Sequence, residues 1–412
     1  MRRHALLALI LVVVNGCASV GEHYSITAVE LGEPSFFPTM EGNTRSPIVP
    51  GNRVQILLNG DELFPPLLEA IRGARKSITF TQYVYEKGDV SQRIADALAE
   101  RCRAGVGVNI LLDYTGSLGF PSEYGTLLTT SGCHLAWFHP LQPWQPNRFN
   151  KRTHRRVLVV DGRIGFTGGF GINQKWTGDG MVRGHWRDTD ARVEGPVVEY
   201  LQAAFAEDWR QATGIVLAGD AYFPRPSSGG SVHAQVVASS PAGGSSDAYL
   251  HFLLAIGSAR HTVFLTNPYF VPDARMTQAL LNAVGRGVRV VVLVPGVIDH
   301  PLVREAGRRD FGPLLQAGIE IYEYQPALLH AKTMVIDGVF VTLGSINLDN
   351  RSFALNQELN LTIYDREIGR RMQQVFATDL SRSAPVTYEA WKRRGLMARV
   401  YEFIALPIKN QL

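Results

Sequence analysis

The sequence predicts an α/β protein in which one fold occurs twice along the chain. Segments with helical periodicity alternate with short apolar segments, a pattern typical of helices packed on a largely buried sheet. The stretch AIRGARKSITFTQYVY (Ala70–Tyr85) recurs as AIGSARHTVFLTNPYF (Ala255–Phe270), and RTHRRVLVVDG (152–162) recurs as LLHAKTMVIDG (328–338). A repeat this long indicates a duplicated domain rather than a solenoid.

Composition agrees with a folded chain of about two domains. The 412 residues are 45% hydrophobic and 19% charged, as in ordinary globular proteins. The net charge of +4 and the pI of about 8.9 are a mild basic excess. This excess is too small to be the electrostatic footprint of a nucleic-acid-binding protein, and it is compatible with an anionic partner.

The N-terminus has the features of a secretion signal. A basic start is followed by the apolar run Ala5–Val14, which as a helix is only about 15 Å long, too short to span a bilayer. The following VNGC resembles the cleavage box of bacterial lipoproteins, which implies a signal peptide at 1–17 and lipidation at Cys17. An ordinary signal peptide or an N-terminal anchor is the alternative. The lipoprotein resemblance implies a lipid-anchored protein of the bacterial cell envelope, facing the periplasm.

Domain boundaries follow from the repeat. We expect a linker at 18–49, a first domain at 50–221, a Pro-, Ser- and Gly-rich linker at 222–232 and a second domain at 233–385. The segment 386–412 mixes aromatic, aliphatic and basic residues, which suits either an interfacial helix on an anionic membrane or a helix docked on the core.

The chain has three cysteines, of which two lie inside the predicted first domain. Cys102 and Cys133 could form a disulfide in an oxidising compartment or remain buried thiols. No CxxC motif is present, which argues against a zinc site of the usual spacing.

Within each half, the repeated phrase predicts a β-hairpin with a two-residue Asp-Gly turn. His330 and Lys332 then lie on one face of a strand, and Ser345 is predicted opposite His330, as Gly169 is opposite His154. A straight strand would put the turn aspartates, Asp161 and Asp337, about 20 Å from these histidines, so strand geometry predicts that they form turns.

A carboxylate follows each phrase at the start of a further predicted strand, Asp188 in WRDTDARV and Glu358 in NQELNLTI. A carboxylate that accepts the imidazole Nδ1–H fixes the tautomer and leaves Nε2 free to attack. Asp188 and Glu358 are therefore candidates for orienting the histidines.

Two HxKxxxxD-type phrases, each followed by a small-residue corner (GGF or GSIN), resemble the phospholipase D superfamily over residues of about 55–385. YQPALLHAKTMVIDGVFVTLGSINLDNRSFALNQELNL and WRDTDARVEGPVVEYLQAAFAEDW are most similar to bacterial cardiolipin synthases. The resemblance implies two α/β/α halves related by a pseudo-twofold axis, which share one active site without metal or cofactor. It also implies a catalytic set and a phosphate-binding set: His154, Arg156, Asp161, His330, Lys332 and Asp337 for the first, and Gly168, Gly169, Ser345 and Asn347 for the second.

The activity implied by this resemblance is transfer of a phosphatidyl group from phosphatidylglycerol through a phosphohistidine. His154 would be the nucleophile and His330 the general acid and base. The partners would be an anionic phospholipid and a membrane surface, with no nucleic acid; the sequence does not predict an oligomeric state.

Arg156 stands where the family has lysine, which leaves two alternatives to transfer. One is hydrolysis by a phospholipase D that uses water as acceptor, and the other is a catalytically silent lipid-binding protein. His154, Gly168, Gly169 and Asp188 all persist in the first half, which favours an active site.

Overall fold

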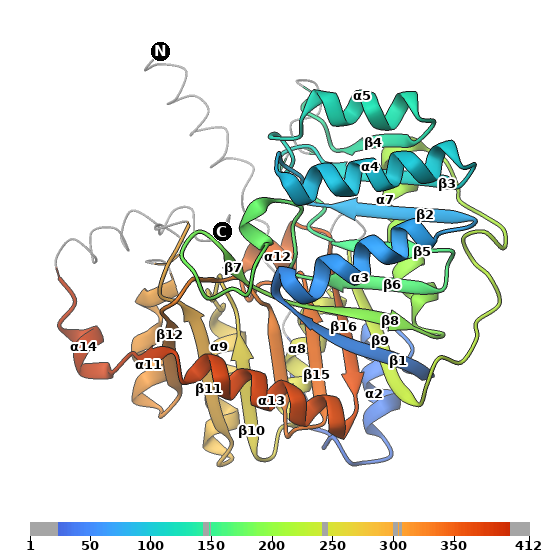
Figure 1. Ribbon diagram of the computed structural model, residues 1–412. Helices are drawn as coiled ribbons and strands as arrows, with labels where there is room; N and C mark the ends of the chain where they lie inside the picture. The colour runs from blue at the N-terminus through green and yellow to red at the C-terminus, as the bar shows by residue number, and fades with distance from the viewer. Residues whose placement is uncertain are drawn as a thin grey trace.

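A computed structural model describes residues 24–142, 148, 150–240, 246–299, 304 and 307–395. Cys17, the predicted signal peptide and residues 396–412 lie outside the described residues. In the described part, fifteen strands form one sheet in the order β17-β12-β11-β10-β14-β15-β16-β9-β1-β8-β6-β5-β2-β3-β4 (Figure 1). Outward from the central β9–β1 pair, the strands of the two halves correspond one to one, and β17 is an addition at one edge. The predicted α/β fold with an internal duplication is confirmed.

The first half begins at the centre of the sheet and ends with a long helix. In chain order it contains β1 (Val49–Leu58), α3 (Asn59–Gly73), β2 (Ser77–Gln82), α4 (Asp89–Arg103), β3 (Gly107–Asp113), α5 (Ser122–Thr130), β4 (His134–Phe138), β5 (Val157–Val160), β6 (Ile164–Gly168), η1 (Gln174–Trp176), β7 (Trp186–Arg187), β8 (Thr189–Glu194) and α7 (Val198–Thr213).

The second half repeats this order with shorter connections. It contains β9 (Val232–Ser239), α8 (Asp247–Ser258), β10 (Thr262–Thr266), α9 (Ala274–Gly285), β11 (Arg289–Pro295), α11 (Phe311–Gln316), β12 (Glu320–Tyr324), β13 (Leu328–Leu329), β14 (Thr333–Ile336), β15 (Phe340–Gly344), α12 (Asn350–Ala354), β16 (Glu358–Tyr364), α13 (Arg366–Leu380), β17 (Ser383–Pro385) and α14 (Tyr388–Lys392).

Alternation along the buried strands explains the layers of each half. In β3, Ile110 packs with the core under α3, α4 and α5, whereas Leu111 packs on the other face with Phe205 and Trp209 of α7. A further core joins the halves, because apolar residues of β5, β8 and α7 pack with those of β14, β15, β16 and α13. This shared core fixes one half against the other.

The hairpin register differs from the prediction by one residue. Thr333 pairs with Leu343, and three residues rather than two separate Ile336 from Phe340. In the first half Val157 pairs with Thr167. Ser345 and Gly169 therefore do not lie opposite the histidines.

The ends of the described chain pack on the second half. Helix α2 (Phe36–Thr44) lies in the stretch predicted to be a linker, 18–49. Its Phe36 and Met40 pack in the hydrophobic core of the second half. That part of the linker prediction is wrong, because an apolar i, i+4 pair gives the helix a face to bury. At the other end, Trp391 of α14 donates to the Arg308 carbonyl at 2.6 Å and packs against Gly312 of α11. The described part of 386–412, which includes Trp391, thus packs on the core, while the other apolar positions proposed for a membrane, Leu396, Val400, Tyr401, Phe403 and Ile404, lie outside the described residues.

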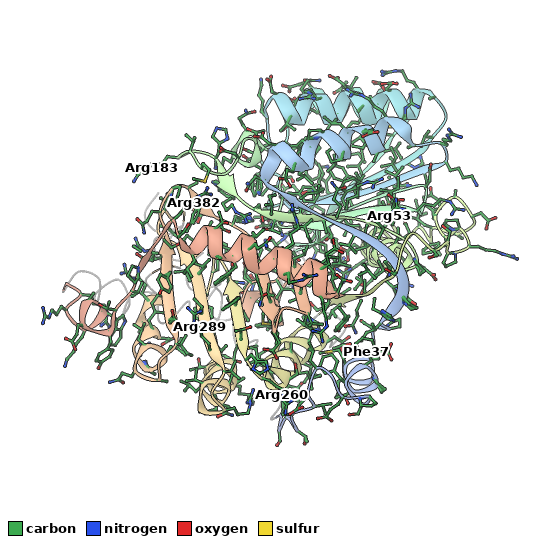
Figure 2. All side chains as sticks on the ribbon, turned by 60° about the horizontal axis from the view of Figure 1, so that its bottom comes forward. Phe37, Arg53, Arg183, Arg260, Arg289 and Arg382 are labelled. Carbon is green, nitrogen blue, oxygen red and sulfur yellow. A yellow bond between two sulfur atoms is a disulfide. The ribbon has the colours of Figure 1, made fainter. Side chains whose placement is uncertain are left out.

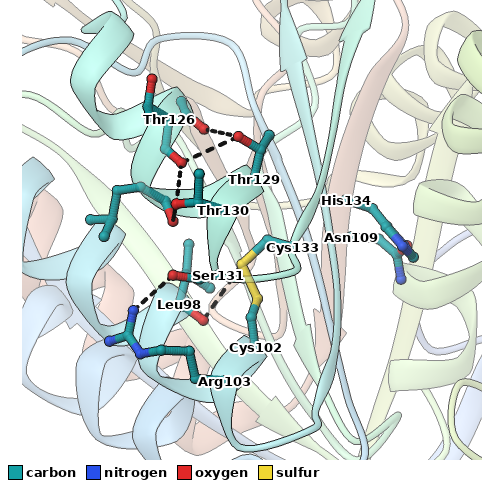
Figure 3. The surroundings of a disulfide bond; sticks show 12 residues. Leu98, Cys102, Arg103, Asn109, Thr126, Thr129, Thr130, Ser131, Cys133 and His134 are labelled. Atoms are coloured by element: carbon teal, nitrogen blue, oxygen red, sulfur yellow. Dashed lines mark hydrogen bonds between the residues drawn. A yellow bond between two sulfur atoms is a disulfide. The ribbon is translucent and has the colours of Figure 1, made fainter.

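Cys102 and Cys133 form a disulfide, the first of the two possibilities that the sequence left open (Figure 3). The bond joins the end of α4 to the residue before β4, where the Cys133 side chain is buried. No helix in the described residues combines the length and apolarity that a membrane span requires.

Candidate active site

The two histidines of the repeated phrases line one cavity of about 350 Å³, built from both halves. His154 lies three residues before β5, and His330 directly follows β13. The two residues are only 7% and 4% exposed. The cavity is lined by Tyr83, Val84, His154, Arg156, Trp176, Trp186, Tyr269, Asp299, His330, Asn347, Asp349, Arg351, Ser352 and Asn356.

Each imidazole is held by a carboxylate from the opposite half. His154 Nδ1 lies 3.0 Å from both Glu358 carboxylate oxygens, and His330 Nδ1 lies 2.7 Å from Asp188 Oδ2. An ionised carboxylate can only accept, so Nδ1 carries the proton and Nε2 keeps its lone pair. The candidate carboxylates are therefore at the histidines, but the pairs cross between the halves.

Backbone pairing explains the crossing. The parallel strands β7 and β13 place Arg187 beside Leu329, and the His330 N–H donates to the Arg187 carbonyl at 2.7 Å. In the equivalent position, the His154 N–H donates to the Gln357 carbonyl at 2.9 Å. The residue before each carboxylate thus binds the histidine of the other half.

Further hydrogen bonds hold the carboxylates. Glu358 accepts from the hydroxyls of Ser345 and Ser352, and Asp188 accepts from Trp176 Nε1 at 2.9 Å. Burial alone would raise the pKa of both carboxyls, but the contacts with the histidines and these donors hold each pKa below its usual value. Both side chains therefore remain ionised at neutral pH.

A cation lies at the Nε2 atom of each histidine. Arg156 Nη2 is 2.8 Å from His154 Nε2, and Lys332 Nζ is 2.9 Å from His330 Nε2 and 3.0 Å from its Nδ1. Burial, aided by these cations, lowers the pKa of His154 to about 4 and that of His330 to about 3, so both imidazoles are neutral at pH 7. Burial also lowers the pKa of Lys332 to about 7. Arg156 therefore occupies the place in its half that Lys332 occupies in the other.

Buried aspartates from α7 and α13 anchor the segments that carry these groups. Asp379 accepts two hydrogen bonds from Arg187, at 2.9 and 3.1 Å, directly beside Asp188. Asp208, at the same place in α7, accepts from Thr153 and Arg155 on either side of His154, both at 2.7 Å. Arg155 and Arg187 are thus committed to internal ion pairs.

The turn aspartates lie elsewhere. Asp161 accepts from the backbone N–H groups of residues 75–77, and Asp337 accepts from those of residues 260–262. Their φ angles are 53° and 51°, the left-handed region favoured in such turns. Neither lines the cavity, so the motif-based placement of Asp161 and Asp337 in the catalytic set is wrong in this structure. They organise the turns, as strand geometry predicts.

Only some of the predicted phosphate-binding residues line the cavity. Asn347 lines the cavity, but Ser345 is turned to Glu358. Gly168 and Gly169 do not line it: a Cβ on Gly169 would lie 2.3 Å from the Asp188 carboxylate, and one on Gly168 would lie 2.0 Å from Asp190. The glycines make room for carboxylates rather than for substrate, which corrects their predicted role.

Sequence reasoning missed most of the cavity wall. Tyr83 meets His154 edge-on at 4.8 Å, and Trp186 lies 4.9 Å from the His330 ring. Tyr269 donates to Asp299 at 2.7 Å. Position at a strand end was a usable signal for Tyr83 and Asp299, whereas Trp176 lies far from either motif in the sequence. No three His, Cys, Asp or Glu side chains in the described ranges are grouped as metal ligands.

Comparisons with known proteins agree with this geometry. The family model described as "Cardiolipin synthase, PLD-like domain" matches residues 67–209 and 252–380. Cardiolipin synthase of Staphylococcus aureus is 34% identical over 357 residues, covering 86% of this chain and 72% of the relative. Cardiolipin synthase of Oceanobacillus iheyensis is 35% identical over 354 residues, covering 86% and 74%.

Two solved structures share the fold. Phosphatidylserine synthase of Haemophilus influenzae superposes with a TM-score of 0.68 at 14% identity, covering 91% of this chain and 99% of that one. Polyphosphate kinase of Porphyromonas gingivalis gives a TM-score of 0.56 at 14% identity, covering 95% and 58%. The chain therefore belongs to the cardiolipin synthase family of phospholipase D-like proteins, and it is an enzyme of the phosphatidyltransferase type.

Proposed function

We propose that this enzyme transfers a phosphatidyl group from phosphatidylglycerol to the hydroxyl of a second lipid through a phosphohistidine. The observation that carries the proposal is the pair of neutral imidazoles on one cavity, each with Nδ1 on a buried carboxylate and Nε2 beside a cation. One phosphodiester between them would meet a nucleophile in one neutral imidazole, and a proton donor in the other once that imidazole has gained a proton.

In the first step, His154 Nε2 attacks phosphorus, the bond from phosphorus to the glycerol oxygen breaks, and His330 protonates the departing oxygen. In the second step, His330 takes the proton of the incoming hydroxyl, whose oxygen attacks phosphorus and releases His154. The near symmetry of the site leaves the two histidines chemically similar, and we assign His154 as nucleophile by its likeness to the family.

The proton donor must gain a proton that burial and the neighbouring cations disfavour. The Lys332 cation contributes to the low pKa of His330, and Arg156 adds to it from the other half. A bound phosphodiester would bring negative charge between these cations, which offsets their effect and raises the histidine pKa. The cations then stabilise the equatorial oxygens in the transition state.

The test uses the purified full-length chain with phosphatidylglycerol vesicles. We expect cardiolipin and glycerol as products, and a covalent adduct on the peptide that contains His154 after rapid quenching. Turnover should be unchanged by EDTA; a loss that added metal restores would contradict the mechanism. Phosphatidic acid as the main product would show hydrolysis instead, and vesicle binding without turnover would show a silent binder.

We also propose that the protein is anchored through Cys17 and faces the periplasm. The Cys102–Cys133 disulfide supports an oxidising compartment. In growing cells, we expect both thiols to react with an alkylating agent only after reduction, and a Cys17→Ala variant to lose incorporation of labelled fatty acid. Alkylation of Cys102 without reductant, or acylation of the variant, would argue against this location.

A further inference from the structure

Among the described residues, the large hydrophobic side chains that are mostly exposed stand on loops of the first half. They are Leu118, Leu141, Val182, Ile215 and Val216, between 54% and 70% exposed. Single exposed apolar residues are common on protein surfaces and need no explanation. The gathering of several at one place does need one, because clustered apolar exposure marks interaction sites.

Three of these residues stand on loops at the rim of the cavity. Leu118 follows β3 in a loop whose Ser117 hydroxyl donates to the carbonyl of Tyr83, a cavity residue, at 2.8 Å. Val182 lies between Trp176 and Trp186, which both line the cavity.

Leu141 follows β4 just after His139, whose carbonyl accepts from Arg152 at 3.0 Å, two residues before His154. Leu141 thus lies at the same edge of the first half as the repeated phrase that contains His154.

The other two residues follow α7, and Val216 lies along the flank of this helix with Ala203, Ala206 and Phe223. This helix starts at the far end of β8 and runs back toward the cavity, where its Gln211 bonds to Gln357, the residue before Glu358. Ile215 and Val216 come directly after its last turn.

The opposite edge of the first half has a different composition. The loops around the Asp161 turn expose Arg75, Lys76, Arg103 and Arg163, and no large apolar side chain stands out there among the described residues. The exposed apolar side chains therefore distinguish the cavity edge from the opposite edge of the first half.

The N-terminal segment of the described chain also lies on the cavity side of the molecule. Tyr24, the first described residue, donates to Ser246 at 3.1 Å beside the start of α8. Tyr249 of α8 contacts Phe353 of α12 at 5.0 Å, and Arg351 of α12 lines the cavity. Cys17 precedes Tyr24 by seven residues, a reach of at most about 25 Å. An anchor at Cys17 would hold the cavity side of the molecule close to the bilayer.

Basic side chains flank the apolar residues. Lys175 and Arg183 are exposed on the connection that carries Val182, and Arg382 lies beside it against Met181. Figure 2 shows Arg183 and Arg382 on the same side of the molecule. Apolar tips flanked by cations suit a surface of anionic phospholipid.

We propose that three loops, 114–120, 139–142 and 178–185, form a docking face that inserts into the headgroup layer of an anionic bilayer and sets the cavity mouth against it. The proposal rests on the proposed function, because it supplies the route by which a lipid headgroup reaches His154 and His330 without leaving the membrane.

The test compares two substrates with the full-length chain: phosphatidylglycerol in vesicles, and dibutyryl-phosphatidylglycerol, which is monomeric in water. The triple variant Leu118→Ser, Leu141→Ser, Val182→Ser should lose about tenfold or more of kcat/KM on vesicles and keep its activity on the monomer. The matched apolar variant Leu118→Met, Leu141→Met, Val182→Ile should keep both activities.

A charge pair provides an independent control. Arg183→Gln at the docking face should weaken turnover on vesicles and make it less sensitive to salt, whereas Arg225→Gln, an exposed arginine near the opposite edge, should not. A triple serine variant with full vesicle activity would overturn the docking face. Absence of turnover on both substrates in the unmodified chain would instead refute the proposed function.

Discussion

Replacing either crossed carboxylate by its amide, in Asp188→Asn or Glu358→Gln, should lower kcat by about a thousandfold or more. An amide at this place can donate to Nδ1, which moves the imidazole proton to Nε2 and removes the lone pair that must attack phosphorus or accept a proton. Burial makes the loss severe, because the side chains of Glu358 and Asp188 are 0% and 1% exposed and water cannot substitute for them. Steady-state turnover of phosphatidylglycerol by the two variants measures the effect.

Asp190 is the matched control for this prediction. It is buried two residues from Asp188 on the same segment and accepts from the Phe170 N–H at 3.2 Å. Burial and the neighbouring Asp188 raise the pKa of Asp190 well above its usual value, which makes a neutral amide a close substitute for this carboxyl. Asp190→Asn should therefore change kcat by less than about threefold. An equal loss in Asp190→Asn and Asp188→Asn would show general disruption rather than a tautomer effect.

The crossing also separates the two roles. A phosphodiester with a p-nitrophenol leaving group needs no general acid, so Asp188→Asn should still form the adduct on His154 and accumulate it. Glu358→Gln should form it slowly, although Glu358 lies in the half opposite to His154. The reverse pattern would assign His330 as the nucleophile.

Local sequence pattern was enough for those parts of the site that one hairpin determines. A His and a cation two residues apart on a strand share a face, and in both halves the cation does contact its histidine; His154, Arg156 and His330 line the cavity. The carboxylates were predicted as imidazole partners, but their assignment to the histidine of the other half depends on how β7 meets β13, a contact between segments more than 140 residues apart. No local pattern encodes that choice.

The incorrect predictions also concern features that no local sequence pattern encodes. The register was one residue off because a third residue, Val339, lies between the last paired positions of the hairpin. Gly168 and Gly169 were predicted to bind phosphate, whereas they leave room for Asp190 and Asp188. Trp176, which donates to Asp188, was not predicted because its role depends on the same packing.

Substitution of Arg156 should have the second large effect on activity. Two variants separate the contribution of its charge from that of its shape. Arg156→Gln should lower kcat/KM by about a hundredfold to a thousandfold, because an uncharged side chain cannot offset the charge that builds on the phosphate oxygens. Arg156→Lys should keep activity within about tenfold of the unmodified enzyme, since Lys332 performs the equivalent contact in the other half with a shorter side chain.

The reciprocal variant tests whether the halves tolerate the same exchange. Arg156 has Tyr83 beside it, with the guanidinium carbon 5.7 Å from the ring centre, whereas the side chains around His330 are Trp176 and Trp186. Lys332→Arg must fit a longer, planar group against these rings and should lose more activity than Arg156→Lys. If Arg156→Lys raised kcat/KM well above that of the unmodified chain, arginine would be a handicap rather than a replacement, and the first half would have begun to lose its catalytic role. An unchanged or slightly lower value, together with a large loss in Arg156→Gln, would show that the first half needs a cation at this position and accepts either one.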